Sequence, residues 1–281
     1  MLPAGGSAAA TFTEAPVDEF THQVPLEGLV SLRDCVGFLD HVRNARESRG
    51  MHEELPAAWF DRPAFYFANG ASLHASDADI SLPPSSEKFD FELEIGAILH
   101  SGGSNLTPAE ASECIGGYVL YCDWSARDIQ TEERSMQIGQ GKGKDAAISL
   151  GPWVLSKDEA DLHRTMDGFD FEVLVRINDE QYLSRPFTGM DWSFEELVAY
   201  ASLGASVAAG DIIASGTIPG GCLLERAGDP DFPGWLREGD TVHLDGGPLG
   251  VISTRITAST ASTASTKWRR PHHPLTQRIS N

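Results

Sequence analysis

Apolar and polar residues alternate most strictly between Phe89 and Ile98. A period of two is typical of a strand with one buried face, because successive side chains point to opposite sides of a sheet. We therefore predict a half-buried strand here. Shorter strand-like runs follow at residues 118–122, 171–183, 210–216 and 239–244. In the second of these, Asn178-Asp179 predicts the turn of a hairpin.

Two helix starts carry capping signals. Thr107 stands three residues before Glu110, with Pro108 at the first helical position, and Ser193 stands three residues before Glu196. Such pairs satisfy the free backbone N–H groups of a first helical turn. Many short strands with interspersed helices predict a β-rich α+β fold and not an alternating βαβ sheet.

The organisation of the chain follows its changes in composition. Residues 1–24 predict a flexible N-terminal arm, residues 25–256 one folded catalytic domain, and residues 257–281 a low-complexity basic tail. The whole chain has 281 residues, 41% of them hydrophobic, and a formal net charge of −20. This acidic balance argues against nucleic acid as a partner, because phosphate binding needs a surplus of Lys and Arg.

Several other classes of protein are excluded because the sequence lacks the motifs typical of them. The longest uncharged apolar stretch, residues 197–210, is too short to span a bilayer, and no basic segment typical of a signal peptide precedes Arg33. The four cysteines are scattered, which favours reduced thiols. Together with the missing signal peptide and membrane span, this predicts a cytoplasmic protein with no membrane partner. Glycine-rich nucleotide motifs and the serine-hydrolase elbow Gly-x-Ser-x-Gly are absent from the sequence.

Glu92 and Glu94 are two residues apart on the alternating strand, so they share one face. Two like charges at this spacing repel each other, and a hard divalent cation between them would turn the repulsion into coordination. A polar strand face exposed to solvent is the alternative, and the two residues alone leave both open.

A second polar cluster follows residues 118–122. Asp123 stands at the predicted junction of a strand and a helix, Ser125 is a candidate N-cap, and Arg127 and Gln130 are three apart on one helical face. A carboxylate and two donors at a strand end are typical of a polar site. A simple helix cap with surface charges is the alternative.

Together these motifs resemble the fumarylacetoacetate hydrolase family. The resemblance covers about residues 30–256 and rests on motifs in the family's order, at residues 92–94, 123–130, 142–145, 150–153, 210–217 and 238–240. It implies a catalytic domain with a β-roll or mixed β-sandwich core, short flanking helices and one divalent cation, Mg, Mn or Ca. It also implies a homodimer.

The resemblance also assigns roles to individual residues. The implied metal ligands are Asp34, Glu92, Glu94 and Asp123. The implied catalytic residues are His41, seven residues after Asp34, with Glu225, Lys142, Arg127 and Gln130. The implied substrate contacts are Tyr66, Thr217 and Arg49.

Two places depart from the pattern of the family. Cys35 and Val36 stand where aromatic residues commonly follow the aspartate, and a tyrosine expected a few residues after Gln130 is missing near Arg134. These departures affect the substrate pocket more than the metal ligands.

The implied activity is a metal-dependent hydrolase that cleaves a C–C bond of a 1,3-dicarbonyl or acylpyruvate substrate. In this hypothesis His41, oriented by Glu225, activates a water that attacks a metal-polarised carbonyl. A decarboxylase, tautomerase, hydratase or lyase acting on a 2-oxo acid at the same site is the first alternative. A metal-stabilised scaffold without activity is the second, and it would not need His41 or Glu225.

Overall fold

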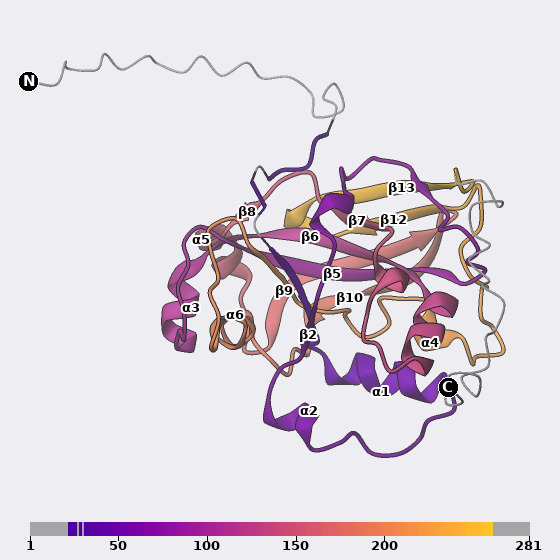
Figure 1. Cartoon of the computed structure of the whole chain (residues 1–281). Helices are drawn as coiled ribbons and strands as arrows, with labels where there is room; N and C mark the ends of the chain where they lie inside the picture. Colours follow the sequence, from indigo (N-terminus) through magenta and orange to yellow (C-terminus); the bar gives the residue numbers. More distant parts are fainter. Residues whose placement is uncertain (1–21, 27, 30, 261–281) are drawn as a thin grey trace, which may run out of the picture.

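The computed structural model describes residues 22–26, 28–29 and 31–260 (Figure 1). Nearly all of the predicted arm and most of the predicted tail, residues 1–21 and 261–281, therefore lie outside the described residues. The described chain folds into two β-sheets with short helices around them. Among these residues, no helix is long and apolar enough to cross a membrane.

The larger sheet contains eight strands in the order β2-β1-β11-β5-β6-β7-β3, with β8 paired to β6. Its strands are β1 (Leu32–Cys35), β2 (Phe65–Phe67), β3 (Leu73–His74), β5 (Phe89–Leu99), β6 (Ile115–Ala126), β7 (Ala147–Leu150), β8 (Leu155–Ser156) and β11 (Ile212–Ala214). The smaller sheet has the order β10-β9-β12-β13-β4. Its strands are β4 (Ile80–Ser81), β9 (Gly168–Ile177), β10 (Glu180–Thr188), β12 (Thr241–Asp245) and β13 (Val251–Thr257).

The helices are short and lie around the sheets (Figure 1). They are α1 (Leu39–Glu47), α2 (Ala58–Asp61), α3 (Pro108–Cys114), α4 (Arg127–Ser135), α5 (Lys157–Ala160) and α6 (Phe194–Ser202). The 3-10 turns are η2 (Gly70–Ser72), η3 (Lys142–Lys144), η4 (Asp161–His163), η5 (Leu224–Arg226) and η6 (Gly247–Leu249). This β-rich α+β architecture confirms the predicted fold class.

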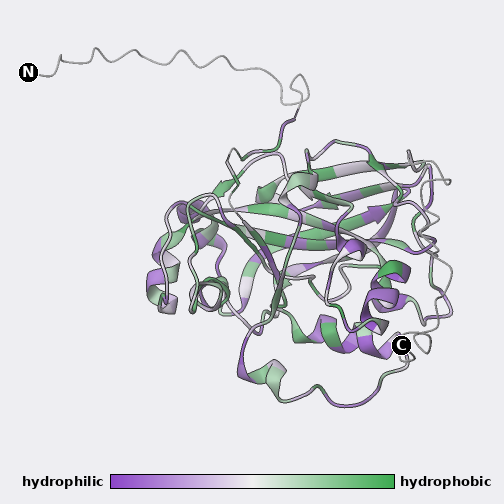
Figure 2. Cartoon of the chain, viewed as in Figure 1, coloured by the Kyte–Doolittle hydropathy of each residue, from purple (hydrophilic) through white to green (hydrophobic). Residues whose placement is uncertain are grey.

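The main core lies between the two sheets. Phe91 and Leu93 of β5 pack in one cluster with Val173 and Val175 of β9 and Leu244 of β12. The central strands are mainly hydrophobic, whereas hydrophilic residues are frequent on α1 and α4 (Figure 2). The odd-numbered residues of β5 therefore hold the sandwich together, and its even-numbered residues face the opposite way.

Two local predictions were wrong in detail. All residues of β5 are buried, so the strand is covered on both faces and its polar face is not a solvent face. Ser125 is not an N-cap, because β6 continues through it to Ala126 and α4 begins at Arg127 without a side-chain cap. The reason is strand pairing: Ser125 lies opposite Asp90 of β5, which extends the ladder beyond Asp123.

The predicted caps and hairpin are confirmed. Thr107 and Ser193 each form a complete capping box, at the starts of α3 and α6. Asn178 and Asp179 join β9 to β10 with φ values of 51° and 66°. Positive φ at both central residues matches the twist of a two-residue hairpin.

Candidate active site

A cavity of about 560 Å³ is lined by residues of α1, α4, β1 and β5. His41 lines it from α1, and Arg127 and Gln130 line it from α4. Asp34 of β1 and Glu92 of β5 line it as well. The cavity therefore joins segments that are far apart in the sequence.

Four carboxylates lie at or next to this cavity, and three of them line it. Asp34 lies on β1, Glu92 and Glu94 lie on β5, and Asp123 lies on β6 directly opposite Glu92. All four side chains are buried. The ammonium group of Lys144 contacts Glu92 and lies 2.8 Å from Asp123 Oδ2. The four predicted metal ligands thus lie close enough to interact through their charges, with the Lys144 ammonium in contact with two of them, Glu92 and Asp123.

The carboxylates differ in their proton affinity. Burial and the charge of Asp123 raise the pKa of Asp34, and burial with the charges of Asp34 and Glu92 raises the pKa of Glu94. Burial also opposes the charge on Glu92, but Arg127 and Lys144 outweigh it and lower its pKa. Without a bound cation, the surroundings therefore favour the protonated forms of Asp34 and Glu94 and the ionised form of Glu92.

The donor set fits a hard divalent cation. Such ions take carboxylate oxygens as ligands, and all four side chains supply them. Asp123 Oδ1 is buried and has no hydrogen-bond partner among the described residues, although such atoms are normally paired. A cation would supply this missing partner. To share Glu92 and Asp123 with a bound ion, the Lys144 ammonium has to shift.

The structure places Lys144, and not the predicted Lys142, in the cavity. Lys142 points to solvent and pairs with Asp145 at 2.6 Å, with a side chain 68% exposed. Lys144 is buried and lines the cavity. The two lysines are at the two ends of η3, so their side chains leave the turn in different directions.

His41 and Glu225 form a hydrogen-bonded pair at one wall. His41 Nδ1 lies 2.7 Å from Glu225 Oε1. Glu225 Oε2 accepts hydrogen bonds from Asn44 Nδ2 at 2.6 Å and from the Gly220 backbone N–H at 2.9 Å. When Nδ1–H donates to Oε1, Nε2 is left as an acceptor. Nε2 lies 3.9 Å from Glu92 Oε1, beside the carboxylate cluster.

Arg127 connects this pair to the cluster. Its guanidinium donates to Glu92 Oε1 at 2.7 Å and to Asp90 Oδ2 at 2.8 Å. Asp90 also accepts from the backbone N–H groups of Leu223 and Leu224, just before Glu225. Burial opposes the charge of Arg127, but Glu92 and Asp90 raise its pKa. Arg127 is therefore a fixed cation that holds the Glu225 turn against β5.

The predicted substrate contacts all reach the cavity. Tyr66 hydrogen bonds to Asp123, and the Thr217 hydroxyl lies 3.3 Å from Glu94 Oε1. Gln130 contacts Arg127 at 3.4 Å and Gln140 at 2.7 Å. Arg49 and Arg134 both line the cavity. Tyr66 and Thr217 thus border the carboxylate cluster.

Three residues of this site were missed by sequence reasoning. Asp90 had a detectable signal, because it shares the period of two with Glu92 and Glu94 and so lies on the same face. Lys144 stands two residues after Lys142, and no local pattern distinguishes the two. In the sequence, Arg134 stands out only as a departure from the expected tyrosine.

Comparison with known proteins bears on the family of the chain. A family model for the C-terminal domain of fumarylacetoacetate (FAA) hydrolase matches residues 32–257. The fumarylacetoacetate hydrolase domain-containing protein 2 of Pongo abelii is 30% identical over 252 residues, covering 88% of this chain and 73% of that protein. A mitochondrial oxaloacetate tautomerase of Bos taurus is 31% identical over 224 residues, covering 79% and 65%. The chain spans about 65% of the length of several such curated relatives.

Solved structures share the fold. The fumarylpyruvate hydrolase from Pseudomonas aeruginosa, in complex with Mn2+ and pyruvate, superposes with a TM-score of 0.64 at 20% identity, covering 82% of this chain and 91% of that chain. The 5-carboxymethyl-2-hydroxymuconate delta-isomerase from Mycobacterium smegmatis gives a TM-score of 0.66 at 20% identity, covering 89% and 87%. At this level of identity the likeness extends to the fold alone.

Proposed function

The chain belongs to the fumarylacetoacetate hydrolase family, as its motifs predicted, and we propose that it hydrolyses a C–C bond of an acylpyruvate-type substrate with the help of a divalent cation. The observation that carries this proposal is the hydrogen-bonded pair of His41 and Glu225 beside four buried carboxylates, three of which line one cavity with His41. A scaffold that only binds a metal has no need of this pair.

Asp34, Glu92, Glu94 and Asp123 would hold the cation, which we propose to be Mg, Mn or Ca. When bound, such an ion supplies Lewis-acid polarisation of a substrate carbonyl. The Mn2+ in the related fumarylpyruvate hydrolase structure is consistent with this choice. Tyr66 and Thr217 hydrogen bond to two of the ligands and so fix the orientation of their carboxylates.

His41 would be the general base. Glu225 holds the ring through Nδ1, so Nε2 accepts a proton from water, and the hydroxide attacks the carbonyl carbon. The C–C bond next to that carbon then breaks, and its electron pair passes to the pyruvate-like half as an enolate. Lys144 and Gln130 face the cavity and would stabilise the enolate oxygen, and the proton on His41 returns to the enolate carbon. Arg127 is held by Asp90 and Glu92, so it acts mainly by fixing the site.

Arg49 and Arg134 favour an acidic substrate. Within the described residues, neither Arg49 nor Arg134 has an ion pair with a carboxylate. Partial burial, with the charges of Arg134 and Arg127, lowers the pKa of Arg49 to about 10. A carboxylate on the substrate would relieve this repulsion. We therefore propose a substrate with an acidic group at the end that lies away from the cluster.

Tautomerisation of a 2-oxo acid is the second candidate, because curated relatives at 27–31% identity are named oxaloacetate tautomerases. This reaction moves one proton between carbon and oxygen and breaks no C–C bond. Nε2 of His41 or the Lys144 ammonium could carry that proton within the same cavity. Decarboxylation, hydration and lyase reactions remain alternatives with no observation that favours them.

The decisive test follows products by NMR. The Mg2+- or Mn2+-loaded protein is incubated with acylpyruvates and with oxaloacetate. Hydrolysis yields pyruvate and a second acid, whereas tautomerisation only speeds the exchange between keto and enol forms. His41→Ala is expected to keep cation binding and to lose about 10²- to 10⁴-fold in turnover, because a general base contributes that much. Full turnover by His41→Ala would disprove the role of this residue.

The family resemblance also implies a homodimer, and the sequence predicts a cytoplasmic location. Both stay predictions. Light scattering on the purified chain measures the first, and the location of a tagged full-length protein in cells measures the second.

A further inference from the structure

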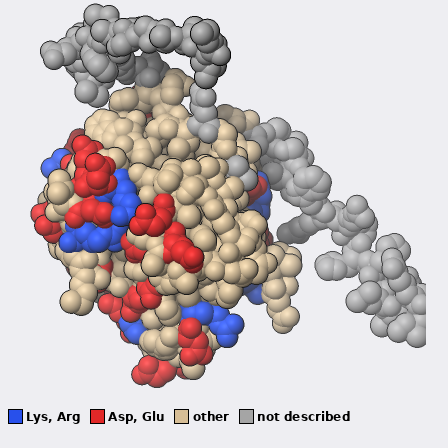
Figure 3. All heavy atoms as spheres, turned by 90° about the vertical axis from the view of Figure 1, so that its left-hand side faces the viewer, with Lys and Arg blue, Asp and Glu red and all other residues tan. Residues whose placement is uncertain are grey.

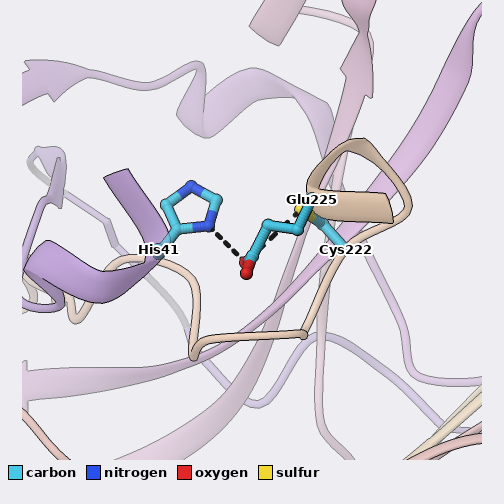
Figure 4. A group of neighbouring side chains, drawn as sticks. All are labelled: His41, Cys222 and Glu225. Carbon is cyan, nitrogen blue, oxygen red and sulfur yellow. Dashed lines mark hydrogen bonds and ion pairs between the residues drawn. The ribbon is translucent and has the colours of Figure 1, made fainter. Parts of the chain in front are cut away.

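The thiol of Cys222 has no part in the mechanism above, yet it lies directly beside the pair formed by His41 and Glu225 (Figure 4). Its Sγ is 3.9 Å from Glu225 Oε1, the same oxygen that lies 2.7 Å from His41 Nδ1. These nitrogen, oxygen and sulfur atoms all lie within 4.8 Å of one another. Within the described residues, no other three His, Cys, Asp or Glu side chains converge so closely.

The spacing of these atoms suits a tetrahedral ion. Zinc binds nitrogen and oxygen at about 2.0–2.2 Å and sulfur at about 2.3 Å, so neighbouring ligands lie roughly 3.3–3.7 Å apart. The observed 2.7 Å between Nδ1 and Oε1 and 3.9 Å between Sγ and Oε1 lie on either side of this range. Small rotations of His41 and Cys222 would be enough to admit the ion.

The surrounding hydrogen bonds already hold the ligands in place. Asn44 and the Gly220 backbone both donate to Glu225 Oε2, which leaves Oε1 to face His41 and Cys222. The Tyr182 hydroxyl donates to the Cys222 carbonyl at 2.7 Å and fixes the backbone that carries the thiol. Outer contacts of this kind orient the ligands of metal sites.

The ligand chemistry selects a borderline ion over the hard cation of the carboxylate cluster. Mg2+ prefers oxygen ligands, whereas one thiolate and one imidazole suit Zn2+ or Co2+. We propose that His41, Cys222 and Glu225 form a second metal site, for Zn2+ or a similar ion, with cavity water as the fourth ligand. Binding releases the thiol proton to solvent, and the thiolate and carboxylate together neutralise the charge of the ion.

Without the ion, the thiol keeps its proton. Burial and the nearby charge of Asp90 raise the pKa of Cys222, so the metal-free pair of His41 and Glu225 has a neutral neighbour. The site therefore leaves the proposed active form of the enzyme undisturbed until an ion arrives.

A bound ion would also inhibit the enzyme, and this consequence rests on the proposed function. Once Nδ1 binds the metal, the remaining ring proton lies on Nε2. Nε2 then has no lone pair to accept a proton from water. Glu225, shared with the ion, no longer holds His41 in the tautomer that a general base requires.

Cobalt absorption tests the site without any need for turnover. The full chain, saturated with Mg2+, is titrated with Co2+, and a thiolate-to-cobalt charge-transfer band is recorded. We expect one equivalent of Co2+ to produce the band, Cys222→Ser to abolish it, and Cys114→Ser to keep it, because Cys114 is a buried thiol on α3. Absence of the band in the unmodified chain, or its survival in Cys222→Ser, would overturn the site.

A second measurement avoids variants altogether. X-ray absorption of Zn2+ bound to the Mg2+-saturated chain should show one sulfur neighbour at about 2.3 Å, and a shell of oxygen and nitrogen only would also overturn the site. Inhibition is measured last: Zn2+ should stop turnover of the unmodified chain and spare Cys222→Ser. A chain that shows the sulfur neighbour with Zn2+, but hydrolyses no acylpyruvate when loaded with Mg2+ alone, would refute the proposed function and leave the metal site standing.

Discussion

Glu92 and Glu94 lie two residues apart on one face of β5, yet their surroundings move their pKa values in opposite directions. Burial opposes the charge of both. Arg127 and Lys144 outweigh burial at Glu92, whereas Glu94 is also close to the charges of Asp34 and Glu92. Both residues are glutamates, so the residue type does not decide which carboxylate is ionised. The positions of Arg127 and Lys144 decide it.

The effect of these cations on the carboxylates can be tested most directly at Lys144. Its ammonium pairs with Glu92 and Asp123, so it competes with a divalent cation for the same oxygens. Lys144→Met should tighten Mn2+ binding by about tenfold, equal to roughly 1.4 kcal/mol, as measured by titration calorimetry. The same change should lower turnover by about 10²-fold, because one stabilising group for the enolate is lost.

Lys142→Met is the matched control, because it removes the same charge two residues away in solvent. It should leave Mn2+ affinity and turnover nearly unchanged. Weaker Mn2+ binding in Lys144→Met would show that the lysine supports the cluster and does not compete with the ion.

At the scale of elements, local chemistry predicted most of the structure. The capping boxes at Thr107 and Ser193 and the turn at Asn178-Asp179 were found from the sequence, because each depends on neighbouring residues. The start of α4 was not found, since Ser125 looks like a cap until its pairing with β5 is known. Burial of the polar face of β5 was missed for the same reason: segments distant in sequence cover it.

The turn between β9 and β10 carries a stability prediction. Asp179 has φ of 66° and donates or accepts no side-chain hydrogen bond among the described residues, whereas Asn178 bonds to Asp240 and Thr241. Residues with a Cβ pay about 1 kcal/mol or more in this left-handed region, and glycine does not. Asp179→Gly should therefore raise the free energy of unfolding by up to about 1 kcal/mol in urea titrations. Asp179→Val should lower it, and a loss of stability on changing to glycine would contradict this reading of the turn.

At the scale of the whole molecule, the site is assembled from segments that no periodicity could join. Asp34, Glu92, Asp123 and Glu225 come from four separate stretches, and α1 brings His41 to them. Only the resemblance to a family grouped these residues before the fold was known. It gave the four carboxylates and His41 with Glu225, but it could not choose between lysines two positions apart, because that choice depends on the path of η3.

The net charge of −20 is likewise distributed in a way that composition cannot show. On the face formed by the left-hand side of Figure 1, acidic and basic side chains lie next to one another (Figure 3). Among the ion pairs of the described residues, Lys157 and Arg164 pair with Asp161, and Arg164 also pairs with Glu195. Exposed pairs contribute little to stability. The buried carboxylates of the cavity are therefore expected to affect stability more than these ion pairs do.

These carboxylates make the stability of the whole chain depend on pH and on the cation together. The pKa values of Asp34 and Glu94 are raised in the folded state by burial and by neighbouring negative charges. Between its unfolded value, about 4, and its raised value, such a group binds more protons when folded, so metal-free stability falls as pH rises. A bound cation removes this penalty, because it favours the ionised form in the folded state.

Chelation should therefore cost more stability at high pH than at low pH. We expect EDTA to lower the melting temperature of the Mn2+-loaded chain by several degrees at about pH 8 and by much less at about pH 5.5. Glu94→Gln provides the control, because it removes one raised group and one ligand, and it should flatten the pH dependence of the metal-free chain. An EDTA effect that is equal at both pH values would mean that the ion binds outside the carboxylate cluster.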